Sequence, residues 1–240
     1  PLTHTSSPAY FRAKFEREAI PGCDYRAFPL AHISEFPGLL QQYPELEGLS
    51  VTIPHKETVL QYAHHRSPVV QACGATNCLK ITNGNIYAHN TDAIGFEHSL
   101  TPLLQPHHQK ALVLGTGGAA KAVAWVLKEK GVHHLFVTRN EQVQNENTIA
   151  YKHLDNRLLA EYTLIVNASP AGMLPHADTL PPIPYAAIGA QHLLYDLVYK
   201  PEKTLFLQKG EARGAVIKNG YEMLVLQAEA AWAIWNEQPV

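Results

Sequence analysis

The most constraining feature of this sequence is a strand, a glycine-rich loop and a helix in immediate succession. Residues 111–114 form a continuous apolar run, typical of a strand covered on both faces, and residues 121–130 have helical character. Between them, Gly115 permits a tight turn, Gly117 lets the backbone approach a pyrophosphate, and Ala120 allows the helix to pack closely on the sheet. Because a helix N-terminus also offers free N–H groups, this unit predicts a dinucleotide site rather than a merely structural glycine turn.

The end of the next predicted strand, residues 134–138, indicates which dinucleotide binds. A site for NAD would place Asp or Glu there to accept hydrogen bonds from the ribose 2′-hydroxyl, whereas this chain has Arg139. A guanidinium suits the adenosine 2′-phosphate and can stack on adenine. The sequence therefore favours NADP as the cofactor, with a solvated surface arginine as the alternative.

The composition narrows the class of protein. The 240 residues carry a formal net charge of −2 and no basic run, which argues against nucleic acid or an anionic membrane as a partner. No apolar run approaches the roughly 20 residues needed to span a bilayer, and no signal peptide is recognisable. Cys23, Cys73 and Cys78 are in no metal-ligand spacing and are expected to be buried free thiols in a reducing compartment. We therefore expect a cytoplasmic protein.

Helical and extended patterns alternate along the chain, which predicts an α/β fold with a largely parallel sheet. The sequence opens at Pro1 without a methionine, so a strand is expected before it. The expected helical segments are 7–19, 56–64 and 222–235, and the expected extended segments are 24–30, 49–53 and the hairpin strands 78–81 and 86–88 around Asn83-Gly84.

Residues 99–109, with two prolines and a histidine pair, are expected to join two lobes. We expect the first lobe, residues 1–97 plus 217–240, to be an open α/β lobe that binds substrate and carries out catalysis. The second, residues 98–216, is a Rossmann-type lobe that binds NADP. Substrate is expected between the lobes, near the carboxyl ends of the strands.

Polar residues occupy positions in the first lobe where a packed sheet would be apolar. Lys56 follows a predicted strand, Asn77 precedes one, and Asp92 follows the hairpin. These three residues belong to motifs that recur, with others, in one family. The eight matching blocks lie at residues 1–8, 51–56, 74–77, 90–92, 115–119, 167–173, 195–201 and 219–228. In these blocks, and in their order, the chain resembles shikimate dehydrogenase along essentially its whole length.

This resemblance implies a role for each matching residue. Lys56 and Asp92 would be the catalytic pair. The residues that would hold the substrate's carboxylate and hydroxyls, or lie near them, are Thr5, Ser7, Thr52, Asn77, Tyr199 and Gln227. The residues that would contact the cofactor are Gly115, Thr116, Gly117, Gly118, Ala119, Thr138, Arg139, Asn167 and Met173. The implied activity is the reversible NADPH-dependent reduction of 3-dehydroshikimate to shikimate, in the route to chorismate and the aromatic amino acids.

The residue types fit these roles. Hydride transfer to a ketone leaves negative charge on oxygen, so a proton donor such as Lys56 must lie within hydrogen-bond reach, and Asp92 can orient it. A surface salt bridge is the alternative for this pair. Gln227 shares a helical face with Met223 and Leu224, where a bare amide is costly. It is therefore expected either to cap a neighbouring backbone group or to point at a polar ligand.

Three positions depart from the family pattern. Thr5 stands where serine is more usual, and Ser50 replaces a usual asparagine. Val143 stands in place of the second arginine of the cofactor motif, so the grip on the 2′-phosphate is expected to be weaker, or shared with Thr138 and Asn140.

The adjacent histidines at 64–65, 107–108 and 133–134 are expected to be solvated surface residues, and no metal site is predicted. We expect a monomer or homodimer acting on a small molecule. Two other functions remain open: a quinate/shikimate dehydrogenase that uses NAD, and a catalytically silent ligand-binding homologue.

Overall fold

The computed structural model describes residues 7–143 and 145–237, and the chain divides into two compact units. The first unit extends to Glu47 and the second runs from Gly48 to the C-terminus. The first contains the helices α1 (Ser7–Arg17) and α2 (Phe36–Gln42) and the 3₁₀ turn η1 (Ile33–Glu35). The expected extended segment 24–30 pairs with no strand in the part of the chain that is described.

A small four-stranded sheet comes first in the second unit, with the strand order β1-β3-β4-β2. Its strands are β1 (Gly48–Ser50), β2 (His65–Arg66), β3 (Cys78–Thr82) and β4 (Asn85–His89). β3 pairs antiparallel with both β1 and β4, and only β2 and β4 are parallel. The predicted hairpin is confirmed: Asn83 and Gly84 join β3 and β4 with φ angles of 49° and 75°.

The strand expected over 49–53 is shorter than predicted. β1 ends at Ser50, which pairs with Cys78, the first residue of β3. Beyond that point the partner strand has ended, and only one backbone bond, from Val51 N to Asn77 O, continues the pairing. The expected helical segment 56–64 is the 3₁₀ helix η2 (Thr58–Tyr62), and the short helix α3 (Pro68–Cys73) follows β2.

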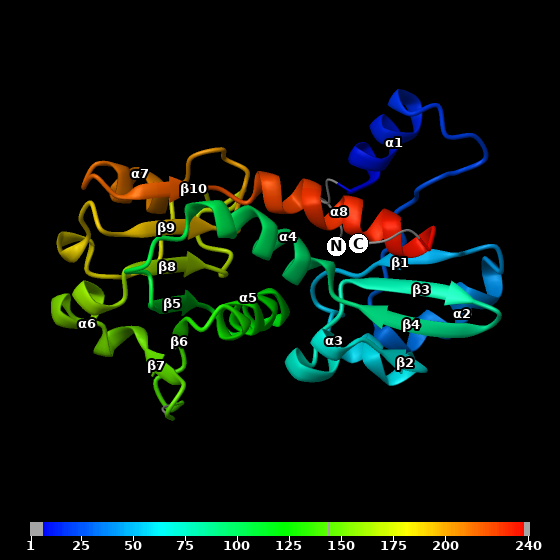
Figure 1. Cartoon of the computed structure of the whole chain (residues 1–240). Helices are drawn as coiled ribbons and strands as arrows, with labels where there is room; N and C mark the ends of the chain where they lie inside the picture. The colour runs from blue at the N-terminus through cyan, green and yellow to red at the C-terminus, as the bar shows by residue number, and fades with distance from the viewer. Residues whose placement is uncertain (1–6, 144, 238–240) are drawn as a thin grey trace. The chain divides into compact units, whose positions relative to one another are not determined.

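The second sheet is the predicted Rossmann-type sheet, with six strands in the order β10-β9-β8-β5-β6-β7, all parallel (Figure 1). The strands are β5 (Lys110–Leu114), β6 (His133–Thr138), β7 (Thr148–Ala150), β8 (Leu164–Asn167), β9 (Leu193–Asp196) and β10 (Val216–Lys218). The helices and turns between them are α5 (Gly118–Glu129), η4 (Tyr151–His153), α6 (Asn156–Glu161), η5 (Tyr185–Ala187) and α7 (Leu205–Glu211).

Apolar side chains are buried on both faces of this sheet. Along β5, Ala111 and Val113 face a core shared with α5, while Leu112 and Leu114 face a second core that includes Leu159 of α6. This two-sided burial explains why the strand reads as an unbroken apolar run rather than as an alternating one.

Two helices connect the two sheets. α4 (Thr91–Leu100) begins directly after β4 and continues through the 3₁₀ turn η3 (Thr101–Leu103) towards β5; this helix was not predicted. Near its end, the Ser99 hydroxyl lies 2.6 Å from the hydroxyl of Tyr195 in β9. α8 (Tyr221–Trp235) leaves β10 and extends to the four-stranded sheet, where Trp235 Nε1 donates to Leu79 O at 3.0 Å (Figure 1).

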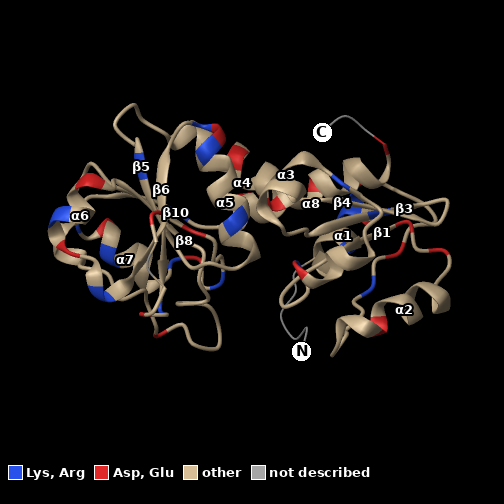
Figure 2. Cartoon of the chain, turned by 90° about the horizontal axis from the view of Figure 1, so that it is seen from below, with Lys and Arg blue, Asp and Glu red and all other residues tan. Residues whose placement is uncertain are grey.

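Basic and acidic residues are interspersed over the helices and strands (Figure 2). Within the described residues, none of the helices combines the length and apolar character required to cross a bilayer.

Candidate active site

The ammonium of Lys56 and the carboxylate of Asp92 form an ion pair, with Lys56 Nζ 2.5 Å from Asp92 Oδ2. The two residues are 36 positions apart in the sequence, and both side chains are largely buried, at 16% and 10% exposure. At such burial the pair differs from an ordinary surface salt bridge, because water screens it less.

Backbone hydrogen bonds hold Lys56 in place. The turn after β1 is closed by His55 N donating to Thr52 O at 2.9 Å, and Thr76 N donates to Lys56 O at 2.8 Å. Lys56 is thus fixed on both sides, by the turn that precedes it and by the segment that leads into β3.

Asp92 lies in the first turn of α4. Asn90 caps this helix by accepting a hydrogen bond from Ala93 N at 3.1 Å, and its own amide donates to Ala75 O at 2.9 Å. A carboxylate near a helix N-terminus is stabilised by the unpaired N–H groups and the positive end of the dipole. The cap therefore both starts the helix and sets the position of Asp92.

The amide of Asn77 connects Asp92 with the final helix. Its Nδ2 lies 2.9 Å from Asp92 Oδ1, 2.9 Å from Thr91 Oγ1 and 3.2 Å from Gln227 Oε1, and its Oδ1 accepts from Thr91 N at 2.7 Å. Gln227 Nε2 donates to Leu224 O within α8 at 2.9 Å. The nitrogen of Gln227 therefore caps a backbone carbonyl, one of the two roles that the sequence left open, and its oxygen joins the polar cluster. Contact of Gln227 with a polar ligand stays a prediction.

Gly95 lets α4 and α8 approach closely. A Cβ atom at this position would come 2.6 Å from Met223 O and 3.0 Å from Gln227 N. The missing side chain allows Gln227 to reach Asn77 and Thr91, and any larger residue would push the two helices apart.

The glycine-rich loop follows β5. Gly115 has a φ of +121°, and a Cβ atom there would meet Ala168 O at 3.1 Å, so glycine is required for both reasons. Gly117 is the N-cap of α5, and no described atom lies within 4 Å of where its Cβ would be. The first-turn amides of α5 lack a side-chain cap among the described residues. They are therefore suited to bind phosphate oxygens.

Thr116 lies in the loop, and Gly118 and Ala119 begin α5. A Cβ atom at position 118 would lie 3.2 Å from Lys56 Cβ and 3.4 Å from Ala75 Cβ. Lys121, one turn along α5, forms an ion pair with Glu57 at 2.8 Å. The predicted cofactor loop and the predicted catalytic lysine are thus in contact in the folded chain.

Arg139 follows β6 and is exposed. In the described parts of the chain, its guanidinium is in no ion pair. The preceding Thr138 accepts from Asn140 N through its hydroxyl at 3.1 Å. An unpaired guanidinium at the carboxyl edge of the sheet fits a phosphate ligand.

Asn167, expected to border the cofactor, is fully buried at the end of β8. Its Nδ2 donates to Ala171 O and Asp196 Oδ1, and its Oδ1 accepts from Ser169 N and Ser169 Oγ. The side chain therefore shapes the loop that follows β8, and a direct cofactor contact stays a prediction. Met173, in the same loop, is 47% exposed.

The sequence analysis missed Asp196. This fully buried carboxylate accepts hydrogen bonds from Thr204 Oγ1 at 2.6 Å, Asn167 Nδ2 at 2.9 Å and Val198 N at 3.0 Å. Burial raises its pKa to about 6, although the three hydrogen bonds oppose this shift. An acid inside the apolar run 193–198 was the signal that could have identified it.

The remaining predicted substrate residues are spread along the chain. Thr52 is exposed in the turn before Lys56, and Tyr199 is half-buried three residues after β9. Ser7 begins α1 in the N-terminal unit, and Thr5 lies outside the described residues.

Among the described side chains, no group of three His, Cys, Asp or Glu is arranged to hold a metal ion. Two expectations were wrong. His108 is buried rather than solvated, and its Nδ1 accepts from Gln105 N at 3.0 Å in the loop before β5. Cys23 is exposed rather than buried, Cys78 is buried as expected, and Cys73 is partly exposed.

Comparison with known proteins identifies the family of this chain. Residues 1–79 match the family model described as the shikimate dehydrogenase substrate binding domain. The NADP(+) shikimate dehydrogenase of Desulforamulus reducens is 31% identical, over 98% of this chain and 87% of that protein.

Solved structures agree with this relationship. A chorismate mutase/shikimate 5-dehydrogenase fusion protein from Clostridium acetobutylicum matches with a TM-score of 0.86 and 31% identity, covering 100% of this chain and 89% of that one. Shikimate 5-dehydrogenase from Thermus thermophilus, in complex with NADP(H) and shikimate, matches with a TM-score of 0.84 and 30% identity over 99% and 90% of the two chains. This chain belongs to the shikimate dehydrogenase family.

Proposed function

We propose that the chain is an NADP-dependent shikimate dehydrogenase that interconverts 3-dehydroshikimate and shikimate in chorismate and aromatic amino acid biosynthesis. The observation that carries this proposal is the Lys56–Asp92 ion pair, 2.5 Å long and directly beside the dinucleotide loop at Gly118. The family relationship supplies the substrate.

The chain's own residues move and orient the proton. A bound nicotinamide cofactor would donate a hydride to the substrate carbon in the reducing direction and accept it in the oxidising direction. In the reducing direction, Lys56 Nζ donates a proton to the oxygen on which negative charge develops. Asp92 holds the ammonium in place, and Asn77 donates to the other Asp92 oxygen at 2.9 Å, so that the carboxylate stays fixed.

The substrate is proposed to bind around the Lys56–Asp92 ion pair. Asn77 and Gln227 already lie within hydrogen-bond distance of each other there, at 3.2 Å. Their proposed role is to bind the substrate's hydroxyls. Thr52 and Tyr199 are proposed to complete the site. The substrate roles that the family resemblance implies for Thr5 and Ser7 stay predictions.

The cofactor site is proposed at the carboxyl edge of the six-stranded sheet. The first-turn amides of α5 and the backbone of 115–119 suit the pyrophosphate, and the unpaired Arg139 suits the 2′-phosphate. Ala168 and Ser169 lie against Gly115, so that the loop after β8 borders the same edge. Met173 is proposed to lie near the nicotinamide.

The two sheets are proposed as the centres of the two lobes. Residues 1–97 with the final helix make up the substrate lobe, and the NADP lobe begins at about residue 98. The six-stranded sheet includes β10, which ends at Lys218, two residues past the boundary expected at 216. A cytoplasmic location and a monomeric or homodimeric state stay predictions.

The test is an absorbance assay for the reduction of NADP by shikimate. It is repeated with quinate in place of shikimate and with NAD in place of NADP. The proposal expects turnover with shikimate and NADP, and clearly lower kcat/KM for the other combinations. Preference for NAD and quinate would instead favour a quinate/shikimate dehydrogenase. Binding of shikimate without turnover would indicate a silent homologue.

A further inference from the structure

Lys152 and Glu141 form an ion pair at the edge of the sheet where Arg139 lies, with Lys152 Nζ 2.6 Å from Glu141 Oε2. β6 and β7 are parallel, and Thr138 pairs with Ala150 at their carboxyl ends. Arg139 is the next residue after Thr138, and Lys152 follows Ala150 by two positions. The Lys152–Glu141 pair therefore lies at the same edge of the sheet as the proposed 2′-phosphate site. The proposed function gives this pair no role.

The backbone places Arg139 beside the chain that leaves β7. Thr138 and Ala150 pair at the ends of β6 and β7, and Arg139 and Tyr151 are the residues that follow them. Burial raises the pKa of Tyr151 to about 12, and the positive charge of Arg139 opposes this shift. Arg139 and the η4 segment, which contains both Tyr151 and Lys152, therefore leave the sheet next to each other.

Glu141 would be unfavourable at this edge if it stood alone. It follows Arg139 by two residues, so their Cα atoms are at most about 7 Å apart. An uncompensated carboxylate near the strand end favours a ribose 2′-hydroxyl and repels a 2′-phosphate. An exposed glutamate is ionised at neutral pH, and the hydrogen bond from Lys152 lowers the pKa of Glu141 further.

We propose that Lys152 determines the preference for a 2′-phosphorylated dinucleotide by neutralising Glu141 beside Arg139. The inference rests on the proposed function, because it deepens the assignment of NADP. Arg139 remains the direct ligand of the phosphate, and Lys152 acts through the charge of Glu141. The pair is exposed, at 47% and 63%, so it can be changed without disturbing the core.

The experiment measures binding by isothermal calorimetry with two probes, adenosine 2′,5′-bisphosphate and adenosine 5′-monophosphate, at low and physiological salt. We expect Lys152→Ala to weaken binding of the bisphosphate about two- to fivefold, the size of one exposed charge interaction, with the larger effect at low salt, and to leave the monophosphate unchanged. Glu141→Gln should strengthen bisphosphate binding, and the double variant should return close to the wild-type affinity or exceed it.

A matched control is available on the same sheet. Lys110 and Glu161 form a surface ion pair of 2.9 Å with similar exposure, at 44% and 46%, but Lys110 is at the amino end of β5. Lys110→Ala and Glu161→Gln should change the affinity for neither probe.

Three results would overturn the inference. One is equal weakening of both probes by Lys152→Ala, another is no change in that variant, and the third is a double variant as weak as Lys152→Ala. A wild-type protein that binds the bisphosphate no better than the monophosphate is a different result, because it would contradict the assignment of NADP itself.

Discussion

Gly118 lies so close to Lys56 that a Cβ atom at position 118 would come within 3.2 Å of the lysine's own Cβ atom. Gly118 is the first residue of α5, the helix whose N-terminus is suited to bind phosphate, and Lys56 is the proposed proton donor. A glycine here lets the N-terminus of α5 and the proposed proton donor lie in one small region. The dinucleotide motif explains glycines 115 and 117, and this contact explains the third.

The first prediction is that Gly118→Ala lowers kcat about tenfold, because an added methyl group displaces Lys56 by a few tenths of an ångström from the reacting atoms. Far-UV circular dichroism should be unchanged. Steady-state kinetics with shikimate and NADP measures the effect.

Gly189→Ala is the matched control. No described atom lies within 4 Å of its would-be Cβ, and its backbone does not need a positive φ. This variant should keep the wild-type kcat. If Gly118→Ala also kept it, the contact with Lys56 would have no catalytic consequence.

The second prediction concerns the cofactor. Arg139→Ala should raise the KM for NADP far more than that for NAD, since only NADP carries the 2′-phosphate. Loss of one charge-assisted hydrogen bond costs about 1.5–3 kcal/mol, which corresponds to roughly ten- to hundredfold.

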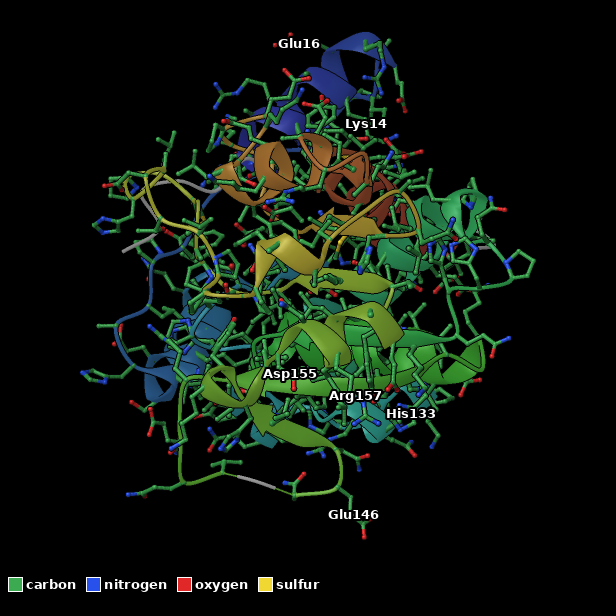
Figure 3. All side chains as sticks on the ribbon, turned by 90° about the vertical axis from the view of Figure 1, so that its left-hand side faces the viewer. Lys14, Glu16, His133, Glu146, Asp155 and Arg157 are labelled. Carbon is green, nitrogen blue, oxygen red and sulfur yellow. The ribbon has the colours of Figure 1, made fainter. Side chains whose placement is uncertain are left out.

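Arg157, which extends from α6 in Figure 3, provides the control. Arg157→Ala removes an exposed arginine from the same sheet domain and should alter neither KM. Equal increases for NADP and NAD in Arg139→Ala would mean that Arg139 acts on the adenine ring or on stability.

The third prediction concerns pH and stability. The pKa of Asp196 is raised from 3.8 to about 6 by burial, so the folded state binds this proton more tightly than the unfolded state does. Its contribution to stability is therefore fully present below the unfolded value and is lost as pH rises through about 6. The total change is about 3 kcal/mol.

Asp196→Asn keeps the shape and removes the charge. We expect the free energy of unfolding of the wild type, relative to this variant, to fall between about pH 4 and about pH 7. Urea titrations at several pH values measure both curves, and the other carboxylates cancel in the difference. Parallel curves would show that Asp196 does not titrate in this range.

The six-stranded sheet was predictable because its strands are buried on both faces and its glycine loop has a defined context. The hairpin at Asn83 was predictable for a local reason too, since the turn demands positive φ angles. α4 was missed although Asn90, three residues before Ala93, was a capping signal. The polar residues 90–92 were interpreted only as candidate catalytic residues, and the capping role of Asn90 at the start of a helix was overlooked.

The candidate site depended on contacts that sequence spacing does not contain. Residue types and the family resemblance singled out Lys56, Asp92 and Gln227. Gln227 reaches the region of Asp92 because α4 and α8 pack closely at Gly95, and Lys56 is positioned by the turn after β1. Asn167 shows the converse. Its motif suggested a ligand contact, whereas burial occupies its amide with structural hydrogen bonds.

The most direct test of the account is the turnover of Lys56→Met with shikimate and NADP. Methionine keeps an apolar stem against Gly118 and removes only the ammonium, so the fold and the affinity for NADP should be preserved. We predict a fall in kcat of about two to four orders of magnitude, the usual contribution of a positioned proton donor, with an unchanged Kd for NADP by calorimetry. A folded Lys56→Met variant with near-normal turnover would contradict the assignment of Lys56 as the proton donor.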